Sequence, residues 1–192
     1  MFVVSKDVEL EKFPGAHFIK VKDCLNALQD LAHAHRIQFN YPIIAITGSA
    51  GKTTVKEWLY HLLSPSLRVI RSPKSYNSQL GVALSLLELN AACDVAIIEV
   101  GISKPGEMLR LAEIVQPTIG VFTSFGRSHE ENFKTTEEHL SEKLNLFKSV
   151  QKTFYPSTIQ LTIEQNKKIH GVSLKPETFK KELILIPFDD LA

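Results

Sequence analysis

The chain has 192 residues, which is long enough for one well-buried domain and part of a second. Hydrophobic residues make up 44%, and 22 Lys and Arg stand against 21 Asp and Glu, so the charge balance favours neither nucleic acid nor an anionic membrane surface as a partner. No apolar run approaches the roughly 18 residues of a membrane span. Cys24 and Cys93 form no Cys-x-x-Cys pair, and the N-terminus lacks the features of a signal peptide, so we expect a cytoplasmic protein.

The predicted elements begin with two short strands, at 2–4 and 17–21, and a helix over 22–39 that Pro42 stops. From residue 43 strands and helices alternate. The expected strands are 43–47, 68–70, 94–100 and 118–124, and the expected helices follow the glycine-containing loop at 48–54 and cover 80–89, 106–115 and about 136–149.

This alternation predicts a doubly wound α/β fold with a mostly parallel sheet and helices on both faces, because continuous apolar strands indicate burial on both sides. In such sheets ligands bind at the carboxyl ends of the strands, where the loops at 48–54, 71–79, 101–105 and 124–135 should converge. Beyond residue 150 the pattern weakens. The segment 157–168 could form a helix and 182–188 a strand, but neither clearly continues the sheet.

The loop "AITGSAGKTT" at 45–54 has the strand-to-helix context of a phosphate-binding loop, although Ile46 stands where the common P-loop has glycine. Gly48 and Gly51 would let successive backbone N–H groups point at phosphate oxygens, Lys52 would reach the outer phosphates, and Thr53 would present its hydroxyl to Mg²⁺. Ser49, Ala50 and Thr54 complete the predicted nucleotide-binding set. The alternative is a tight turn whose threonines only begin a helix.

Four other residues are candidates that also have ordinary explanations. Glu99 ends a buried strand next to the loop, where NTPases hold magnesium, but acids often end strands. Asn77 could simply cap the helix that follows it. His129 could be a solvated loop residue, and Lys143 an exposed helix lysine.

Taken together, the ordered segments resemble the ATP-dependent Mur ligases, and within them the MurF group, including MurF fused to alanine racemase. The resemblance rests on "ITGSAGKTTVKEWL", "SYNSQLGVALSLLEL", "AIIEVGISKPGEMLRLAEIVQPTIGVFTS" and "GRSHEENFKTTEEHLSEKLNLF", which occur in the family's order. The family's phosphate loop is the short form Gly-x-x-Gly-Lys-Thr, so Ile46 fits it.

The resemblance implies roles for the weaker candidates. Glu99 and Thr53 would serve one Mg²⁺, and His129 with a carbamylated Lys143 would serve a second. Carbamylation converts a cationic amine into an anionic oxygen ligand, and partial burial favours the neutral amine that reacts with CO₂. The catalytic set implied is Lys52, His129 and Lys143, with Asn77 near the nucleotide.

Two segments depart from the family pattern. Ser124, in "TSFG", stands where the family usually has asparagine near the base. "GISKPGE" replaces "GANHPGE", so Ile102, Ser103 and Lys104 should reshape the amino-acid side of the site.

The implied activity is ATP-dependent addition of D-alanyl-D-alanine to a UDP-linked muramoyl tripeptide through an acyl phosphate, a step of peptidoglycan precursor synthesis. Residues 1–40 would be the tail of an N-terminal UDP-sugar-binding domain with its linker helix, and 41–192 an incomplete central ATP-binding domain. The family's C-terminal domain has no counterpart here, so we expect a fragment that binds nucleotide weakly and does not ligate alone. The alternatives are a folylpolyglutamate synthetase-like ligase or a diverged nucleotide-binding module without enzymatic activity.

Overall fold

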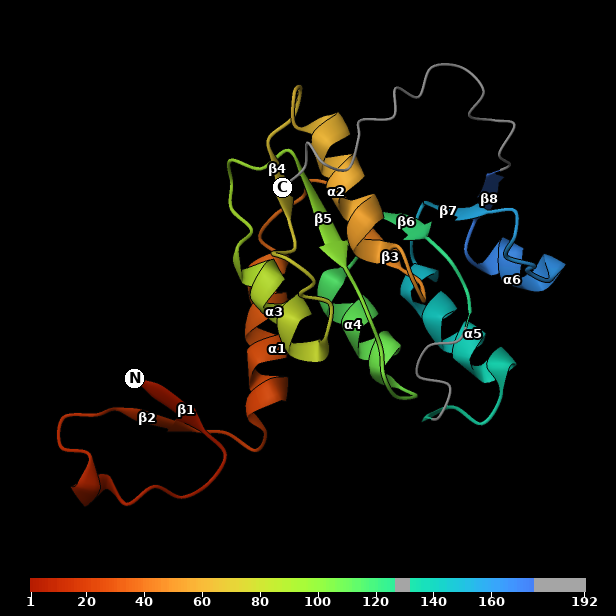
Figure 1. The fold of residues 1–192 in the computed structure, drawn as a ribbon. Helices are drawn as coiled ribbons and strands as arrows, with labels where there is room; N and C mark the ends of the chain where they lie inside the picture. The colour runs from red at the N-terminus through yellow and green to blue at the C-terminus, as the bar shows by residue number, and fades with distance from the viewer. Residues whose placement is uncertain (127–131, 175–192) are drawn as a thin grey trace.

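The computed structural model describes residues 1–126 and 132–174, and its centre is a six-stranded, wholly parallel sheet (Figure 1). The strand order is β4-β5-β3-β6-β7-β8. The strands are β3 (Ile43–Thr47), β4 (Val69–Arg71), β5 (Val95–Glu99), β6 (Ile119–Phe122), β7 (Lys152–Pro156) and β8 (Gly171–Leu174). The helices between them are α2 (Lys52–Leu63), α3 (Gln79–Leu87), α4 (Glu107–Val115), α5 (Thr136–Leu144) and α6 (Ile163–Lys168), with a 3-10 turn at Asn145–Phe147.

Alternate residues of the central strands contribute to two separate hydrophobic cores, one on each face of the sheet. Ile44 and Ile46 of β3 pack with Val55 and Leu59 of α2 on one face. Ile43 and Ala45 join the larger core that α3 and α4 build on the other. Every residue of β3 and β5 is buried, as expected for strands covered on both sides. The predicted doubly wound α/β fold is therefore confirmed.

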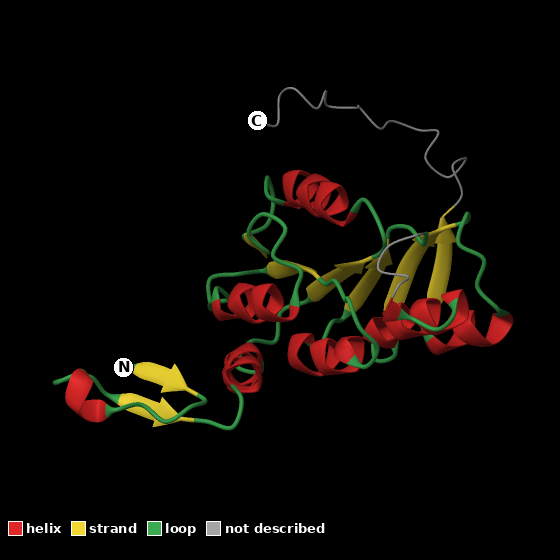
Figure 2. Cartoon of the chain, turned by 60° about the horizontal axis from the view of Figure 1, so that its bottom comes forward, coloured by secondary structure: helices red, strands yellow, loops and turns green. Residues whose placement is uncertain are grey.

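The N-terminal segment forms a small sheet of its own, which stands apart from the larger one (Figure 2). It consists of β1 (Phe2–Val4) paired in parallel with β2 (Phe18–Lys20). Helix α1 (Cys24–Arg36) follows and packs against α3 and α4. The buried Arg36 guanidinium donates to the carbonyls of Val115, Phe39 and Gln116, which ties the end of α1 to the end of α4.

The C-terminal part corrects one expectation from the sequence. Strands β7 and β8 do continue the parallel sheet, β7 beside β6 and β8 beside β7. Their burial alternates or is partial, so they lack the continuous apolar run that marks the central strands. The predicted helix over 157–168 is shorter, as α6, and the predicted strand at 182–188 lies outside the described residues. None of the described helices has the length and apolarity needed to cross a bilayer.

Candidate nucleotide-binding site

The loop after β3 lies at the centre of the sheet, because β3 pairs with β5 on one side and β6 on the other. Gly48 has φ 149°, and a Cβ there would lie 2.1 Å from Thr123 Oγ1 and 2.9 Å from the backbone nitrogen of Ser124. Gly51 has φ 79° and precedes the first residue of α2. Both glycines are thus required by geometry, one by close approach of a neighbouring chain and one by its left-handed backbone.

Residues 123–126, which follow β6, form hydrogen bonds to the glycine loop. Ser124 Oγ accepts from the Ala50 N–H at 2.9 Å, and the Ser124 carbonyl accepts from the Ser49 N–H at 2.9 Å. Ser49 Oγ donates to the Gly126 carbonyl at 2.9 Å. Ser124, which stands where the family usually has asparagine, therefore holds the glycine loop in place through these hydrogen bonds. This role is set by tertiary contacts, and no sequence pattern indicated it.

Helix α2 begins at Lys52 without a side-chain cap, so no side chain occupies the N–H groups of its first turn. The Lys52 Nζ bends back and donates to the Gly48 carbonyl at 2.9 Å. Burial lowers the pKa of Lys52, and the nearby Glu99 carboxylate acts in the opposite direction. The arrangement places a cation and free backbone donors at one point, which is the chemistry of an anion site.

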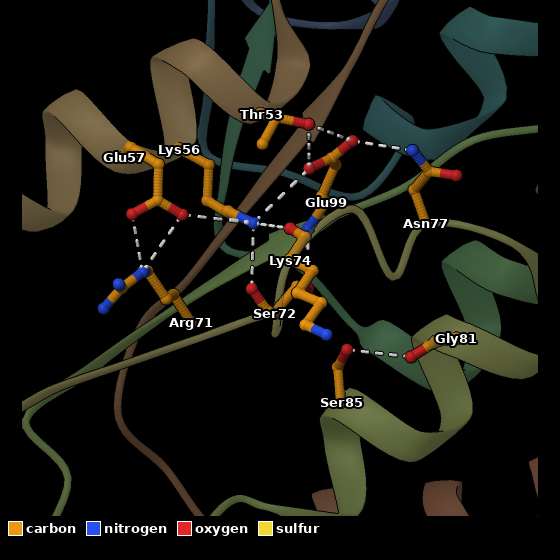
Figure 3. A network of polar contacts seen from close by, with 10 residues as sticks. All are labelled: Thr53, Lys56, Glu57, Arg71, Ser72, Lys74, Asn77, Gly81, Ser85 and Glu99. Carbon is orange, nitrogen blue, oxygen red and sulfur yellow. Dashed lines mark hydrogen bonds and ion pairs between the residues drawn. The ribbon is translucent and has the colours of Figure 1, made fainter. Parts of the chain in front are cut away.

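Glu99, at the end of β5, is fully buried and its carboxylate is shared between two neighbours (Figure 3). Thr53 Oγ1 donates to this carboxylate, lying 2.9 Å from Oε2 and 3.1 Å from Oε1. Asn77 Nδ2 donates to Oε1 at 2.6 Å. Ser78, not Asn77, caps α3, since the Ser78 hydroxyl accepts from the Gly81 N–H. The capping explanation for Asn77 is therefore wrong.

A cavity of about 480 Å³ opens beside these residues. Three of the four loops predicted to converge, those after β3, β4 and β5, line it, as expected for the carboxyl ends of parallel strands, whereas no described residue of the fourth, 124–135, is among its lining residues. Its lining residues are Leu25, Gly48, Ser49, Lys52, Asn77, Ser78, Gln79, Leu80, Gly101, Ile102, Ser103, Glu107 and Lys143. Of the other predicted binding residues, Ala50, Gly51, Thr53 and Thr54 belong to the adjoining loop and helix start but do not line the cavity.

Lys143 reaches this cavity from α5 and is only 2% exposed, so it is not an ordinary surface lysine. Burial, and to a lesser extent the positive charge of Lys52, lower the pKa of Lys143 to about 8. No carboxylate or carbonyl within residues 1–126 and 132–174 pairs with its amine. Much more of this amine is therefore neutral near neutral pH than of an ordinary lysine, and Lys143 lines the cavity.

The segment 102–107 forms another part of the cavity wall, through Ile102, Ser103 and Glu107. The Glu107 carboxylate accepts from the backbone N–H of Ser103 at 2.7 Å and of Lys104 at 3.0 Å, so it fixes the turn before α4. Ile102 is buried and lines the cavity. At this position the departure from the family pattern replaces alanine by the larger apolar side chain of Ile102.

The donor chemistry near the loop fits a hard cation, because a carboxylate and a hydroxyl meet beside a phosphate-type cradle. No group of three or more His, Cys, Asp and Glu gathers in the described ranges. Two protein oxygens completed by phosphate oxygens and water are the usual environment of Mg²⁺. His129, the other predicted ligand, lies outside the described residues.

A parallel α/β sheet whose central strand runs through Gly-x-x-Gly-Lys-Thr into a helix, with a carboxylate on the neighbouring strand, defines a P-loop-type nucleotide-binding domain. The family model of the Mur ligase middle domain matches residues 46–178. The chain belongs to this family.

Sequence relatives carry the name UDP-N-acetylmuramoyl-tripeptide–D-alanyl-D-alanine ligase. The relative from Treponema pallidum is 40% identical over 134 residues, covering 69% of this chain and 29% of the relative. The relative from Synechocystis is 42% identical over 109 residues, covering 57% of this chain and 24% of the relative. The chain therefore spans less than a third of the length of either protein.

Solved structures of MurF also resemble this chain. MurF from Acinetobacter baumannii superposes with a TM-score of 0.79 at 26% identity, over 91% of this chain and 38% of that one. An FPGS from L. casei has a TM-score of 0.55 at 15% identity over 86% of this chain and 52% of that one, which shows a shared fold alone. The folylpolyglutamate synthetase alternative is thus the less supported of the two.

Proposed function

We propose that this chain is the ATP-binding core of a MurF-type ligase, which joins D-alanyl-D-alanine to UDP-N-acetylmuramoyl-tripeptide in peptidoglycan precursor synthesis. The observation that supports this proposal most strongly is the Glu99 carboxylate, which is held by Thr53 and Asn77 next to Lys52 and the glycine loop. The names of the relatives supply the reaction, and a MurF structure from Thermotoga maritima was determined in complex with ADP. Residues 1–40 would belong to the domain that receives the UDP-sugar.

In this proposal the backbone of residues 48–51 and the first turn of α2 cradle the ATP phosphates. Lys52 exchanges its bond to the Gly48 carbonyl for the outer phosphates, and the negative charge of these phosphates compensates the cost of its burial. Ser49, Ala50, Thr54 and Asn77 complete the nucleotide-binding set. The segment 123–126 has already fixed the loop, so less ordering entropy is lost on binding.

Thr53 and Glu99 would hold one Mg²⁺, and His129 with a carbamylated Lys143 the second. Bound magnesium would neutralise charge on the transferring phosphoryl group. The burial and lowered pKa of Lys143 support carbamylation, because only the neutral amine attacks CO₂, and the reaction releases one proton. The product is an anion beside Lys52, which replaces repulsion between two cations by attraction.

The reaction would run in two displacements. A carboxylate oxygen of the tripeptide forms a bond to the γ-phosphorus while the bond to the β-phosphate oxygen breaks, giving ADP and an acyl phosphate. The dipeptide amine then attacks the acyl carbon, loses a proton, and expels phosphate. Lys52 and the loop N–H groups stabilise the charge that develops in the first step. The apolar wall with Ile102 would contact the acceptor peptide.

Isothermal calorimetry of ATP binding, with MgCl₂ or with EDTA, tests the proposal. We expect magnesium to tighten binding to the wild-type chain, and Lys52→Ala to weaken it roughly tenfold or more, because a charge-assisted contact to phosphate is lost. Lys148→Ala removes an exposed lysine that does not line this cavity, and serves as the matched control. If wild type and Lys52→Ala bind ATP alike and without any effect of magnesium, the site assignment is wrong.

A further inference from the structure

Lys56 is a lysine that the sequence pattern did not single out and that the proposed mechanism does not use. Its side chain is 0% exposed, although it lies on α2 one turn after Lys52. Its Nζ donates to the Ser72 carbonyl at 2.9 Å and to the Lys74 carbonyl, both in the loop that follows β4 (Figure 3). Lysine is rarely buried completely unless its charge is paired, so this position needs an explanation.

The same amine lies between two carboxylates. Its Nζ is 3.3 Å from Glu57 Oε1 and 3.6 Å from Glu99 Oε2. Glu57 is held on its other side by Arg71, at 2.9 Å. The Glu99 carboxylate is therefore held by hydrogen bonds from Thr53 on α2 and Asn77 in the loop before α3, and by an ion pair with Lys56 on α2.

Lys56 also fixes the loop that carries Asn77. Lys74 has φ 48°, a left-handed conformation that a non-glycine residue holds only when its surroundings impose it. The carbonyl of Lys74 points at the Lys56 amine, which supplies such a constraint. Ser72, two residues before Lys74, contacts Glu99 directly, since Ser72 Oγ accepts from the Glu99 N–H at 3.0 Å.

The far end of this loop closes onto the residues after β5. The Gly101 N–H donates to the Asn77 carbonyl at 2.7 Å, and a Cβ on Gly101 would lie 3.1 Å from Asn77 Oδ1. Lys56 at one end and Gly101 at the other thus hold the loop in the position from which the Asn77 amide reaches Glu99.

We propose that Lys56 is a positioning residue which, by bonding the 72–77 loop and pairing with Glu99, sets the magnesium dependence of nucleotide binding. This inference rests on the proposed function, because the metal role of Glu99 is part of that function. If Lys56 only supported the packing of α2, its loss would loosen the fold around it without a specific effect on Glu99 or Asn77.

The first measurement needs no ligand. Lys56→Gln keeps an N–H donor but removes the charge, and is milder than Lys56→Met. Amide hydrogen exchange is followed by NMR at two adjacent residues, the Gly101 N–H, which donates to Asn77, and the Val100 N–H, which donates to the Ile46 carbonyl in the sheet. We expect exchange at Gly101 to accelerate about tenfold or more, with a much smaller change at Val100.

The second measurement is an ATP titration at increasing MgCl₂. We expect Lys56→Gln to raise the magnesium concentration for half-maximal effect about fivefold, while ATP affinity in EDTA changes less than about twofold. Glu57→Gln is the matched control, because it alters the other carboxylate beside Lys56 and leaves the bonds to Ser72 and Lys74 in place. It should leave the magnesium dependence unchanged.

Equal acceleration at Gly101 and Val100, or none at either, overturns the positioning role. An unchanged magnesium requirement in a folded Lys56→Gln chain overturns its link to the metal. A wild-type chain that binds ATP without any magnesium effect contradicts the proposed function instead, and the exchange measurement then decides alone whether Lys56 holds the loop.

Discussion

Two buried lysines, on helices that pack on opposite faces of the sheet, have opposite surroundings. Lys56 of α2 is fully enclosed, and its amine faces two carbonyls and two carboxylates. Lys143 of α5 is almost as inaccessible, but it faces a cavity and another cation, Lys52.

The difference shows that burial alone does not define the role of a lysine. An amine whose donors are all used holds other groups in place, whereas an amine that is desolvated and uncompensated is ready to lose its proton and react. The first stabilises the folded state, and the second costs stability until a ligand or a modification compensates it. Four predictions test this contrast.

The largest effect is expected for Lys56→Met. It should lower the free energy of unfolding by about 3–5 kcal/mol, because two carboxylates and two carbonyls lose a buried partner. Urea unfolding measures this. Lys148→Met, at an exposed site, should stay within about 0.5 kcal/mol of wild type. A loss below about 1 kcal/mol would show that the contacts of the Lys56 amine contribute little to stability.

Lys143→Met should act in the opposite direction. The pKa of Lys143 falls from 10.5 to about 8 on folding, so below pH 8 the folded protein carries the full cost of a buried charge. Between pH 8 and 10.5 the unfolded chain binds more protons, so wild-type stability rises with pH in that window. We expect the variant to gain about 1–3 kcal/mol at pH 7 and to lose this rise.

Urea unfolding in CO₂-free buffer at several pH values measures both effects. A variant that is less stable than wild type at pH 7 would show that the Lys143 amine is compensated after all. CO₂ must be excluded because a carbamate would replace the cation whose cost is being measured.

Reaction with CO₂ should distinguish the two lysines directly. At pH 8 about half of the Lys143 amine is neutral, and it faces the cavity. With ¹³C-bicarbonate, NMR should therefore show, besides the carbamate of the exposed N-terminal amine, a carbamate resonance that Lys143→Met abolishes and Lys56→Gln retains. The same set of carbamate signals in wild type and Lys143→Met would contradict the assignment.

The smallest effect concerns the coupling between Lys52 and Lys143. Because burial is the main cause of the lowered pKa and Lys52 the lesser one, Lys52→Met should raise the pKa of Lys143 above 8 without restoring 10.5. The pH dependence of labelling at Lys143 by acetic anhydride, followed by mass spectrometry, measures this shift. An unchanged profile would mean that the two amines do not interact.

The sequence predicted the central half of the fold well, because local signals agreed there. The strand 43–47, apolar up to Thr47, and the apolar strand before Glu99 indicated burial on both faces, and the glycine loop between strand and helix located the site. The strand 152–156 was not predicted from the sequence, because only Thr153 and Tyr155 are buried and a proline ends it. This pattern also fits an irregular segment.

Within the site, the missed features are those that depend on distant contacts. Lys56 shares a helical face with Leu59 and Leu63, so a charge within an apolar stripe was the available signal. Nothing local to Ser124 indicates its bonds to residues 49 and 50, which lie more than seventy positions away. The proximity of Lys52 and Lys143 is likewise a product of the fold alone.

The central position of β3 has a kinetic consequence. Ile46 is paired with Glu99 and Thr47 with Phe122, so the glycine loop acquires its neighbours only after strands far along the chain have docked on both sides. Such non-local pairings form late, because the entropy lost on closing a long loop is compensated only after the strands have made their contacts. The time course of acquiring nucleotide affinity during refolding should therefore follow completion of the sheet, and ATP binding becomes a reporter of the last step of folding.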